Sequence, residues 1–376
     1  MDRPNRWTES DRRFMASALR LARRGLTRVE PNPAVGAVLV QSDGPIGQGW
    51  HRQFGKSHAE IEAIEDARRL GNDLHGSTLY VTLEPCCHWG KTGPCTEAIL
   101  REGIARVVVA AADPFDRVGG KGIKQLQDGG VSVEVGLLEA EARALNAWWY
   151  KFYETGRPWV IGKWAQTLDG KFACANGHSQ WISSPASRKV VHALRWSVRA
   201  IVTGSGTVAS DDPELTVRLA KVSPAGPPLR VVLDSRARIG CDSRLVATSR
   251  EVPVLVMTGP QVDPQREDAL RAGGCEVWRV GADEDGLDLD EVVGELGRRG
   301  AGRVLVEAGA TLMSGFLRRG LLDELVVFVS SALAMDPEAR QLSGLSPETV
   351  DQFEREYALQ SVRRVGDDVM LVLWRR

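Results

Sequence analysis

The sequence lacks a long hydrophobic run, a strong net charge and a leader-like start. No apolar stretch in its 376 residues approaches the roughly 18 residues that a membrane-spanning helix requires. Residues 1–10 are too polar for a secretory leader. The formal net charge is -1, and the arginines are spread along the chain, so we expect neither a membrane nor nucleic acid as the main partner. These absences predict a cytoplasmic protein.

Cysteine is also scarce, and its placement is informative. The chain has six cysteines, and Cys86, Cys87 and Cys95 lie close together. In a chain that is not secreted, such a cluster favours a metal site or catalysis over a disulfide framework.

Length and composition indicate a globular protein of more than one domain. Hydrophobic residues make up 43% and charged residues 26% of the chain, as in ordinary soluble proteins. A prior of about 150 residues per domain gives two or three domains. Gly156-Arg157-Pro158 interrupts a helical pattern and marks a boundary. We therefore expect one domain over residues 7–150 and a second over residues 157–376.

Apolar spacing predicts alternating helices and strands in the first domain. Thr8 and Asp11 resemble a capping box at the start of the first helix. Helices are expected at 8–24, 58–70, 96–102 and 138–153, and strands at 34–41, 78–83, 106–112 and 131–135, with 44–49 as a turn. This order predicts an α/β sandwich on a mostly parallel sheet.

The second domain has the same α/β character. Strands are expected at 159–165, 199–203, 229–234, 253–257, 276–280 and 303–306, and helices at 185–197, 264–272, 289–298 and 311–318. Residues 324–329 and 369–374 alternate in polarity, which favours an antiparallel hairpin at the sheet edge.

Two short stretches of the first domain carry ligands for zinc. His58-Ala59-Glu60 opens an expected helix, and Pro85-Cys86 is followed by Cys95. Zinc takes tetrahedral nitrogen and sulfur ligands, and a catalytic zinc keeps one position open. Three ligands with a glutamate beside them match the H-x-E…P-C…C signature of zinc-dependent nucleobase deaminases. There the metal activates a water, and the glutamate carries protons to the ring and to the leaving ammonia.

A structural zinc site, or three unrelated residues, is the alternative interpretation. A closed site needs a fourth ligand, for which Cys87 and His88 are the candidates. The eight residues between Cys86 and Cys95 exceed the usual spacing of about two to four, which weakens the generic motif. Glu60, however, has no use in a structural site. We therefore favour a catalytic zinc and expect Cys87 to be a small buried residue.

Two glycine turns in the second domain suit a dinucleotide. Gly204-Ser205-Gly206-Thr207-Val208-Ala209 nearly spells the G-x-G-x-x-A fingerprint, but Asp211-Asp212-Pro213 would cut its helix short. Glu307-Ala308-Gly309-Ala310-Thr311 is a second strand-to-helix turn, whose free amides suit a diphosphate. On these residues alone, two ordinary turns remain the alternative.

Taken together, the motifs resemble the bifunctional deaminase/reductase family of riboflavin biosynthesis. The match in the first half includes Pro31-Asn32-Pro33, His51, His58-Ala59-Glu60 and the long interval between Cys86 and Cys95. In the second half it comprises residues 163–171, Ser179-Gln180-Trp181-Ile182, Asp211-Asp212-Pro213 with Arg218, and Glu307-Ala308-Gly309. The resemblance implies a cytidine-deaminase-like α/β/α domain followed by a dihydrofolate-reductase-like α/β domain.

The resemblance also implies two reactions on one small-molecule substrate. A zinc-dependent domain would deaminate a phosphoribosylaminopyrimidine, with Zn2+ on His58, Cys86 and Cys95 and Glu60 as proton carrier. The second domain would use NADPH to reduce the ribosyl group to a ribityl chain. No nucleic acid or membrane partner is implied, and we expect a homo-oligomer.

Further contacts follow from the same resemblance. The deaminase substrate would contact Asn32, His51, Lys91 and Asp113. NADPH would contact Ala165, Trp181, Thr207, Asp211, Ser235 and the turn formed by Gly309, Ala310, Thr311, Leu312, Met313, Ser314 and Gly315. The reductase substrate would contact Ser179, Arg195, Leu215, Arg218 and Glu307. The two arginines suit a phosphate, although both could instead be solvated surface charges. Lys163 and Asp169 are polar residues without an assigned role.

The chain departs from the family pattern at Cys87, Trp89, Gly93 and Phe115. None of these is an expected zinc ligand, but Trp89 and Phe115 fall among the local substrate contacts. The alternatives are a deaminase-fold zinc protein with one active domain, an inactive zinc-stabilised binding module, and a nucleic-acid editing deaminase. The near-neutral charge argues against the last of these, and Glu60 argues against the inactive module.

Overall fold

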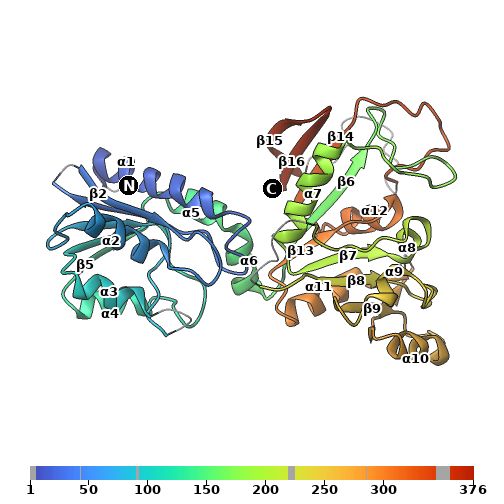
Figure 1. Ribbon diagram of the computed structural model, residues 1–376, viewed down its shortest axis with the longest axis horizontal. Helices are drawn as coiled ribbons and strands as arrows, with labels where there is room; N and C mark the ends of the chain where they lie inside the picture. The colour runs from blue at the N-terminus through green and yellow to red at the C-terminus, as the bar shows by residue number, and fades with distance from the viewer. Residues whose placement is uncertain (1–5, 43, 90–92, 219–224, 285, 344–355) are drawn as a thin grey trace. The chain divides into compact units, whose positions relative to one another are not determined.

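The computed structural model describes residues 6–42, 44–89, 93–218, 225–284, 286–343 and 356–376. The chain divides into two compact units, Met1–Thr155 and Gly156–Arg376, which Figure 1 colours from blue to green and from green to red. No helix in these residues is long and apolar enough to cross a membrane.

A five-stranded sheet forms the centre of the first unit, in the order β2-β1-β3-β4-β5. Its strands are β1 (Gly36–Gln41), β2 (Gly44–Trp50), β3 (Thr78–Val81), β4 (Arg106–Val109) and β5 (Ser132–Val135). Its helices are α1 (Glu9–Ala22), α2 (Ala59–Arg69), α3 (Cys95–Arg101), α4 (Lys121–Asp128), α5 (Glu139–Leu145) and α6 (Ala147–Thr155), with a short 3-10 turn at Arg23–Gly25. The expected capping box begins α1, because the Thr8 hydroxyl accepts from the Asp11 amide at 3.0 Å and Asp11 accepts from the Thr8 amide at 2.9 Å.

Helices cover both faces of this sheet (Figure 1). Side chains of successive strand residues point to opposite faces, so Ala37 and Leu39 pack with α2, α3 and α4. Val38 and Val40 pack with α1 and α5 on the other face. The expected three-layer α/β/α arrangement is confirmed.

The expectation of a mostly parallel sheet is wrong for this unit. β1 pairs antiparallel with both β2 and β3, while β3–β4 and β4–β5 are parallel. Residues 44–49 were expected as a turn and lie in β2 instead. The expected helix over 138–153 is also divided, into α5 and α6. The Asn146 side chain, at the break, exchanges two hydrogen bonds with the backbone of Ala34, at 2.8 and 2.9 Å.

The second unit is built on a nine-stranded sheet in the order β10-β9-β8-β7-β13-β6-β14-β16-β15. These strands are β6 (Trp159–Gln166), β7 (Ala200–Gly204), β8 (Leu229–Leu233), β9 (Val254–Thr258), β10 (Glu276–Arg279), β13 (Arg303–Val306), β14 (Glu324–Val329), β15 (Tyr357–Val365) and β16 (Asp368–Arg375). The helices are α7 (Pro185–Trp196), α8 (Ser205–Asp211), α9 (Arg244–Ala247), α10 (Pro264–Ala272), α11 (Leu289–Arg298) and α12 (Ala310–Arg318), and β11 (Ala282–Asp283) pairs with β12 (Gly286–Leu287).

In the sheet order from β10 through β9, β8, β7, β13 and β6 to β14, each strand pairs in parallel with the next. Strands β16 and β15 then add an antiparallel edge. Two apolar cores fill its faces, one below α11 and α12 and the other below α7. The antiparallel pairing of 324–329 with 369–374 is confirmed. These two strands do not form a hairpin, however, because β15, which was not expected, pairs with β16 at the edge.

Candidate functional site

The expected zinc ligands come together from three elements of the first unit. His58 is the residue just before α2, Cys86 follows β3 and its turn, and Cys95 is the first residue of α3. Their ligand atoms all lie within 4.8 Å of one another. Nδ1 of His58 is 3.4 Å from the sulfur of Cys86 and 3.4 Å from that of Cys95.

This geometry fits a tetrahedral zinc. Bond lengths of about 2.3 Å to sulfur and about 2.0 Å to nitrogen place such ligand atoms roughly 3.5 Å apart. Cys87 is outside this set, since its thiol points to the carbonyl of Arg117 at 3.7 Å. The hydrogen bond between the two cysteines lowers the pKa of Cys86 and raises the pKa of Cys95, so the pair favours one thiolate, the form that binds metal.

Glu60 lies in the first turn of α2, two residues after His58. Its side chain is buried, at 4% exposure, and burial is the main cause that raises its pKa to about 7. A carboxyl group with a pKa near the working pH can both accept and return a proton. Glu60 therefore has the character of a proton carrier rather than of a structural anion.

Asn32 and His51 lie beside the metal cluster. The Asn32 amide is 3.3 Å from Nε2 of His51, and Nδ1 of His51 is 3.0 Å from the carbonyl oxygen of Ser57. The rings of His51 and His58 meet edge to face, with centroids 5.4 Å apart. Burial lowers the pKa of His51, which favours the neutral imidazole. Lys91, the third expected substrate contact, lies outside the described residues.

Asp113 is held in place by its neighbours. Its Oδ1 accepts from the Phe115 amide at 3.0 Å and from the indole of Trp149 at 2.9 Å. Phe115, one of the departures from the family pattern, packs against Trp149 and Tyr153, with centroids 6.3 and 4.8 Å apart. Trp89, another of the four departures, is 75% exposed.

No role was expected for Glu84, whose buried side chain contacts the backbone of the segment 113–123. Its carboxylate is buried and accepts hydrogen bonds from the backbone amides of Asp113, Gly120, Gly122 and Ile123 at 3.0 to 3.3 Å. It thereby ties the segment 113–123 to the strand end that carries Cys86. The only signal in the sequence is its position within Glu84-Pro85-Cys86.

A cavity of about 990 Å³ opens in the second unit, at the upper end of the range for ligand sites. All the expected reductase contacts except Met313 and Ser314 line it: Ala165, Ser179, Trp181, Arg195, Thr207, Asp211, Leu215, Arg218, Ser235, Glu307, Gly309, Ala310, Thr311, Leu312 and Gly315. Residues from six separate stretches of sequence, between Ala165 and Gly315, thus share one cavity.

Met313 and Ser314 do not line the cavity, because they lie on the inner side of α12. Met313 is fully buried in the core, and the Ser314 hydroxyl accepts from the Ser343 amide at 3.0 Å. Any contact that these residues make with a cofactor would therefore involve their backbone.

Three charged residues meet at one wall of this cavity. Arg195 binds Glu307 through two hydrogen bonds of 2.6 and 3.0 Å, and Nζ of Lys163 is 3.6 Å from Oε2 of Glu307. Burial opposes ionisation of Glu307, but Arg195 and Lys163 outweigh it and lower its pKa to about 2. The alternative that Arg195 is a solvated charge is wrong, since its side chain is 13% exposed. Sequence reasoning left Lys163 without a role, and burial lowers its pKa.

Arg218 is more open to solvent than Arg195. Its guanidinium pairs with Glu214 at 3.1 Å and is 59% exposed, and its amide donates to Nδ1 of His192 at 3.2 Å. It thus lines the cavity with donors available to a ligand.

Asp169 is the other polar residue that had no assigned role. Its carboxylate accepts hydrogen bonds from the amides of Ala334 and Met335 at 3.0 and 2.9 Å, and it therefore holds the loop that contains these two residues.

Family models match both units. The cytidine and deoxycytidylate deaminase zinc-binding region matches residues 8–111, and the RibD C-terminal domain matches residues 158–371. The first contains the cluster of His58, Cys86 and Cys95, and the second contains the large cavity.

Whole proteins with the same two parts are similar along the full chain. The riboflavin biosynthesis protein RibD of Aquifex aeolicus is 37% identical over 96% of this chain and 98% of its own, and that of Escherichia coli is 36% identical over 96% and 99%. The structure of RibD from Acinetobacter baumannii has a TM-score of 0.81 at 36% identity, covering 98% of this chain and 99% of that one. A deaminase/reductase of Thermotoga maritima has a TM-score of 0.77 at 34% identity, with the same coverage. The chain therefore belongs to the RibD family of bifunctional riboflavin biosynthesis enzymes, in which a zinc-binding-type deaminase domain precedes a reductase domain.

Proposed function

We propose that residues 7–150 catalyse the hydrolytic deamination of a diaminohydroxyphosphoribosylaminopyrimidine, and that residues 157–376 then reduce the ribosyl group of the product with NADPH. The observation that carries the first step is the cluster of His58, Cys86 and Cys95 with Glu60 buried alongside. The similar Thermotoga maritima protein is a diaminohydroxyphosphoribosylaminopyrimidine deaminase and 5-amino-6-(5-phosphoribosylamino)uracil reductase, which supports this pair of reactions.

The donor set of the first site fits a zinc ion. His58 would bind through Nδ1 and the two cysteines through their sulfurs, which leaves one tetrahedral position for a water. Zinc in such a site supplies the acidity that makes water a nucleophile at neutral pH. Three protein ligands and no fourth, among the described residues, favour a catalytic over a structural zinc.

Glu60 performs the proton transfers of the proposed deamination. Its carboxylate accepts a proton from the attacking water and delivers it to the ring nitrogen. It then accepts the proton that remains on the added hydroxyl and delivers it to the amino group, which departs as ammonia. The pKa of about 7 keeps both directions accessible. Asn32, His51 and Asp113 position the pyrimidine, and a buried neutral His51 can exchange hydrogen bonds with the ring substituents.

The second site separates a cofactor side from a substrate side. NADPH supplies the hydride. Gly309 is the N-cap of α12, and residues 310–315 form the first turns of this helix, whose free N-terminal amides suit the diphosphate. Arg218 suits the phosphate of the substrate, while Glu307, fixed by Arg195 and Lys163, accepts hydrogen bonds from ribose hydroxyls.

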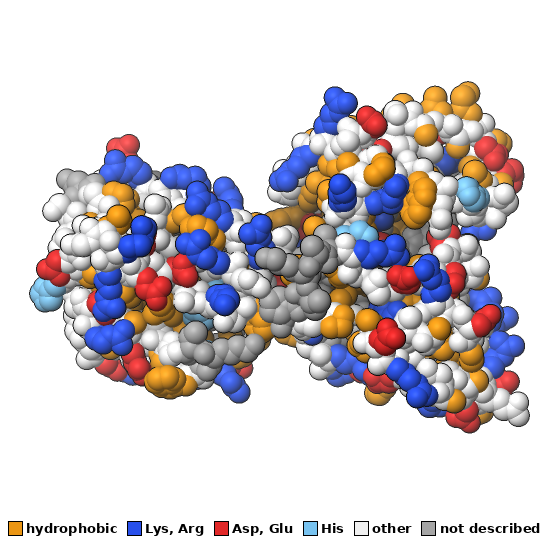
Figure 2. All heavy atoms as spheres, in the orientation of Figure 1, with side chains coloured by type: hydrophobic (Ala, Val, Ile, Leu, Met, Phe, Trp, Pro, Cys, Tyr) orange, Lys and Arg blue, Asp and Glu red, His pale blue; other side chains and the backbone are white. Residues whose placement is uncertain are grey.

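The remaining expectations belong to this proposal as well. On the face shown in Figure 2, basic and acidic side chains are interspersed rather than gathered by sign, in keeping with a small-molecule substrate rather than nucleic acid. A homo-oligomer and a cytoplasmic location stay predictions, and sedimentation of the purified chain tests the first.

A metal analysis and a paired assay test the proposal. The protein should contain about one zinc per chain, release ammonia from the aminopyrimidine without NADPH, and consume NADPH only once deaminated substrate is present. Arg218→Ala should raise KM for the reductase substrate and leave ammonia release unchanged. Unchanged reductase KM and rate would contradict the phosphate contact, and ammonia release from zinc-free protein would contradict the deaminase mechanism.

A further inference from the structure

A second, smaller cavity in the reductase unit has no assigned role. It has a volume of about 400 Å³ and lies between α8 and the loop that joins β8 to α9. Ser205, Gly206, Asp212 and Arg238 line both this side cavity and the large one, so the two share a wall. None of the residues expected to contact cofactor or substrate lines the side cavity.

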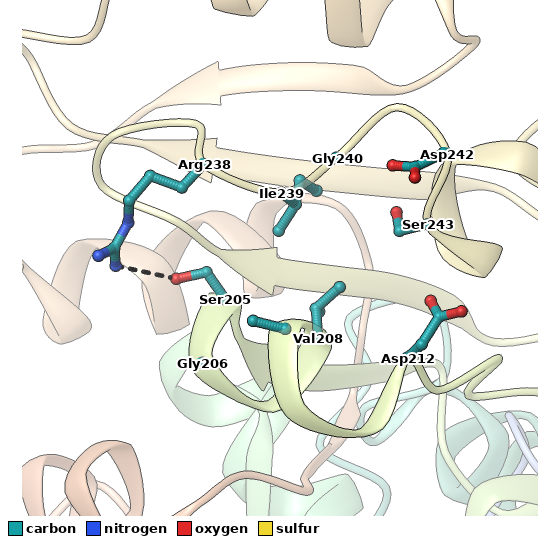
Figure 3. Close-up of a pocket in the computed structure, with 10 residues that line it drawn as sticks. Ser205, Gly206, Val208, Asp212, Arg238, Ile239, Gly240, Asp242 and Ser243 are labelled. Atoms are coloured by element: carbon teal, nitrogen blue, oxygen red, sulfur yellow. Dashed lines mark hydrogen bonds between the residues drawn. The ribbon is translucent and has the colours of Figure 1, made fainter.

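Arg238 lies at the shared wall, where Ser205 and Asp234 contact its guanidinium. Its Nη2 donates to the Ser205 hydroxyl at 3.3 Å, as the dashed line in Figure 3 shows. Its Nε lies 3.7 Å from Oδ1 of Asp234, a fully buried carboxylate whose other oxygen accepts from the Ile239 amide at 2.8 Å. A guanidinium has five N–H donors. Among the described residues only Ser205 and Asp234 contact the guanidinium of Arg238, so most of its donors remain available to a ligand.

The far end of the side cavity is acidic, whereas the end at Arg238 is basic. Figure 3 shows Asp242 and Ser243 on the loop and Asp212 at the end of α8, away from Arg238, with Val208 and Ile239 between the two ends. Two carboxylates would repel an anion, whereas they can accept hydrogen bonds from hydroxyl or amino groups. The Ser243 hydroxyl is buried and has no hydrogen-bond partner among the described residues. An anionic ligand group is therefore favoured only near Arg238.

The neighbours of Arg238 identify the ligand. Ser205 is two residues before Thr207, and Arg238 is three residues after Ser235; Thr207 and Ser235 are both cofactor contacts in the proposed reductase. NADPH differs from NADH only by a phosphate on the 2′-oxygen of its adenosine ribose. Arginine binds phosphate through charge-assisted hydrogen bonds that lysine or a hydroxyl matches less well.

We infer that Arg238 and Ser205 form the subsite for the 2′-phosphate of NADPH, and that Arg238 makes this reductase select NADPH over NADH. The inference rests on the proposed reductase function and adds to it the origin of cofactor choice. Asp234 acts as a positioning residue, because it holds Nε of Arg238 and leaves the outer nitrogens directed to the ligand.

A binding measurement separates the inference from catalysis. Adenosine 2′,5′-bisphosphate and adenosine 5′-monophosphate are titrated calorimetrically into the zinc-loaded full-length protein. The wild type should bind the bisphosphate more tightly. Arg238→Ala should weaken the bisphosphate about 10- to 100-fold, the range for one lost charged hydrogen-bonding partner, and leave the monophosphate unchanged.

Arg236→Ala is the matched control. Arg236 is exposed on the same loop and lines neither cavity, so its loss should change neither affinity. Arg238→Lys keeps the charge without the guanidinium fork and should restore part of the binding. Equal affinity of the wild type for the two nucleotides, or equal losses for both in Arg238→Ala, would overturn the inference.

Steady-state kinetics provide the second readout. Arg238→Ala should lower kcat/KM with NADPH about 10- to 100-fold through KM, with little change when NADH is used. An equal loss with both cofactors would show a structural role instead. If neither cofactor supports reduction by the wild type, the proposed reductase function fails, and the binding experiment still decides whether Arg238 recognises the 2′-phosphate.

Discussion

Glu60 distinguishes the proposed catalytic zinc site from a structural one. It is buried beside three ligands, makes no ion pair among the described residues, and has a pKa raised to about 7 by burial. Glu60→Gln keeps the shape of the side chain but cannot accept the water proton. We expect the variant to retain zinc and to lose ammonia release by roughly 10²- to 10⁴-fold, as measured by metal analysis and an ammonia assay.

Glu65→Gln is the control for this substitution. Glu65 is on the same helix but exposed, so its replacement should leave both zinc content and rate unchanged. Deamination retained in Glu60→Gln would remove the proton-transfer role of this residue.

Glu307 gives the reductase unit a pH-dependent contribution to stability. Its pKa is lowered from 4.5 to about 2 in the folded protein, so the stabilisation is complete above about pH 5 and is lost as the pH falls toward 2. The shift corresponds to roughly 3 kcal/mol.

Thermal unfolding of the wild type and of Glu307→Gln at several pH values measures this contribution. The variant leaves the buried Arg195 charge unpaired, which is strongly destabilising at neutral pH. We expect the difference in stability between the two proteins to narrow as the pH is lowered from 6 to about 3. A constant difference across this range would show that Glu307 does not titrate with a depressed pKa.

At the scale of elements, Glu84 connects the segment 113–123 to the loop that carries Cys86, an expected zinc ligand. Glu84→Ala removes the acceptor for four backbone amides of the 113–123 segment. Unsatisfied buried N–H groups are costly, so we expect a loss of about 2–5 kcal/mol in the free energy of unfolding of this unit. Hydrogen exchange at residues 120–123 should accelerate.

Glu97→Ala serves as the comparison, because Glu97 is exposed on α3 and should change neither quantity. Unaltered exchange at 120–123 in Glu84→Ala would mean that the segment is held by other contacts.

Most elements could be predicted from apolar periodicity, and β2 shows why some could not. Its sequence, Gly-Pro-Ile-Gly-Gln-Gly-Trp, has no alternation of apolar residues. Gly47 and Gly49 lie against α2, where an added Cβ would be 2.4 Å from the Ala63 carbonyl oxygen and 2.5 Å from that of Ala59. The glycines serve close packing on a helix distant in sequence, and local patterns carry no information about that contact. β15 was missed because its side chains are mostly exposed.

The site residues also divide into those that local sequence patterns predict and those that depend on contacts distant in sequence. Motif spacing predicted that His58, Cys86 and Cys95 would meet, because the residue types define the chemistry. Buried partners such as Glu84 and Lys163 were left without a role, since their surroundings come from segments far apart in the sequence. Arg238 is a further example, because only the fold places it beside Ser205.

At the scale of the whole molecule, the two sites lie in separate compact units, each with its own cores. We therefore predict that the activities can be removed independently. Glu60→Gln should still reduce substrate that has already been deaminated, and Arg218→Ala should still release ammonia. A mixture of the two variants should restore the complete conversion, which neither completes alone at low substrate concentration. Failure of the mixture would indicate that the intermediate does not pass through solution.

Product identification tests the central claim, two successive reactions on one substrate, most directly. The purified protein is incubated with the aminopyrimidine, with and without NADPH, and the products are identified by mass. Without NADPH we predict one product in which an amino group is replaced by oxygen, and with NADPH a second product that has gained two hydrogens. Reduction of the substrate before deamination, or no change of mass in either mixture, would contradict the account.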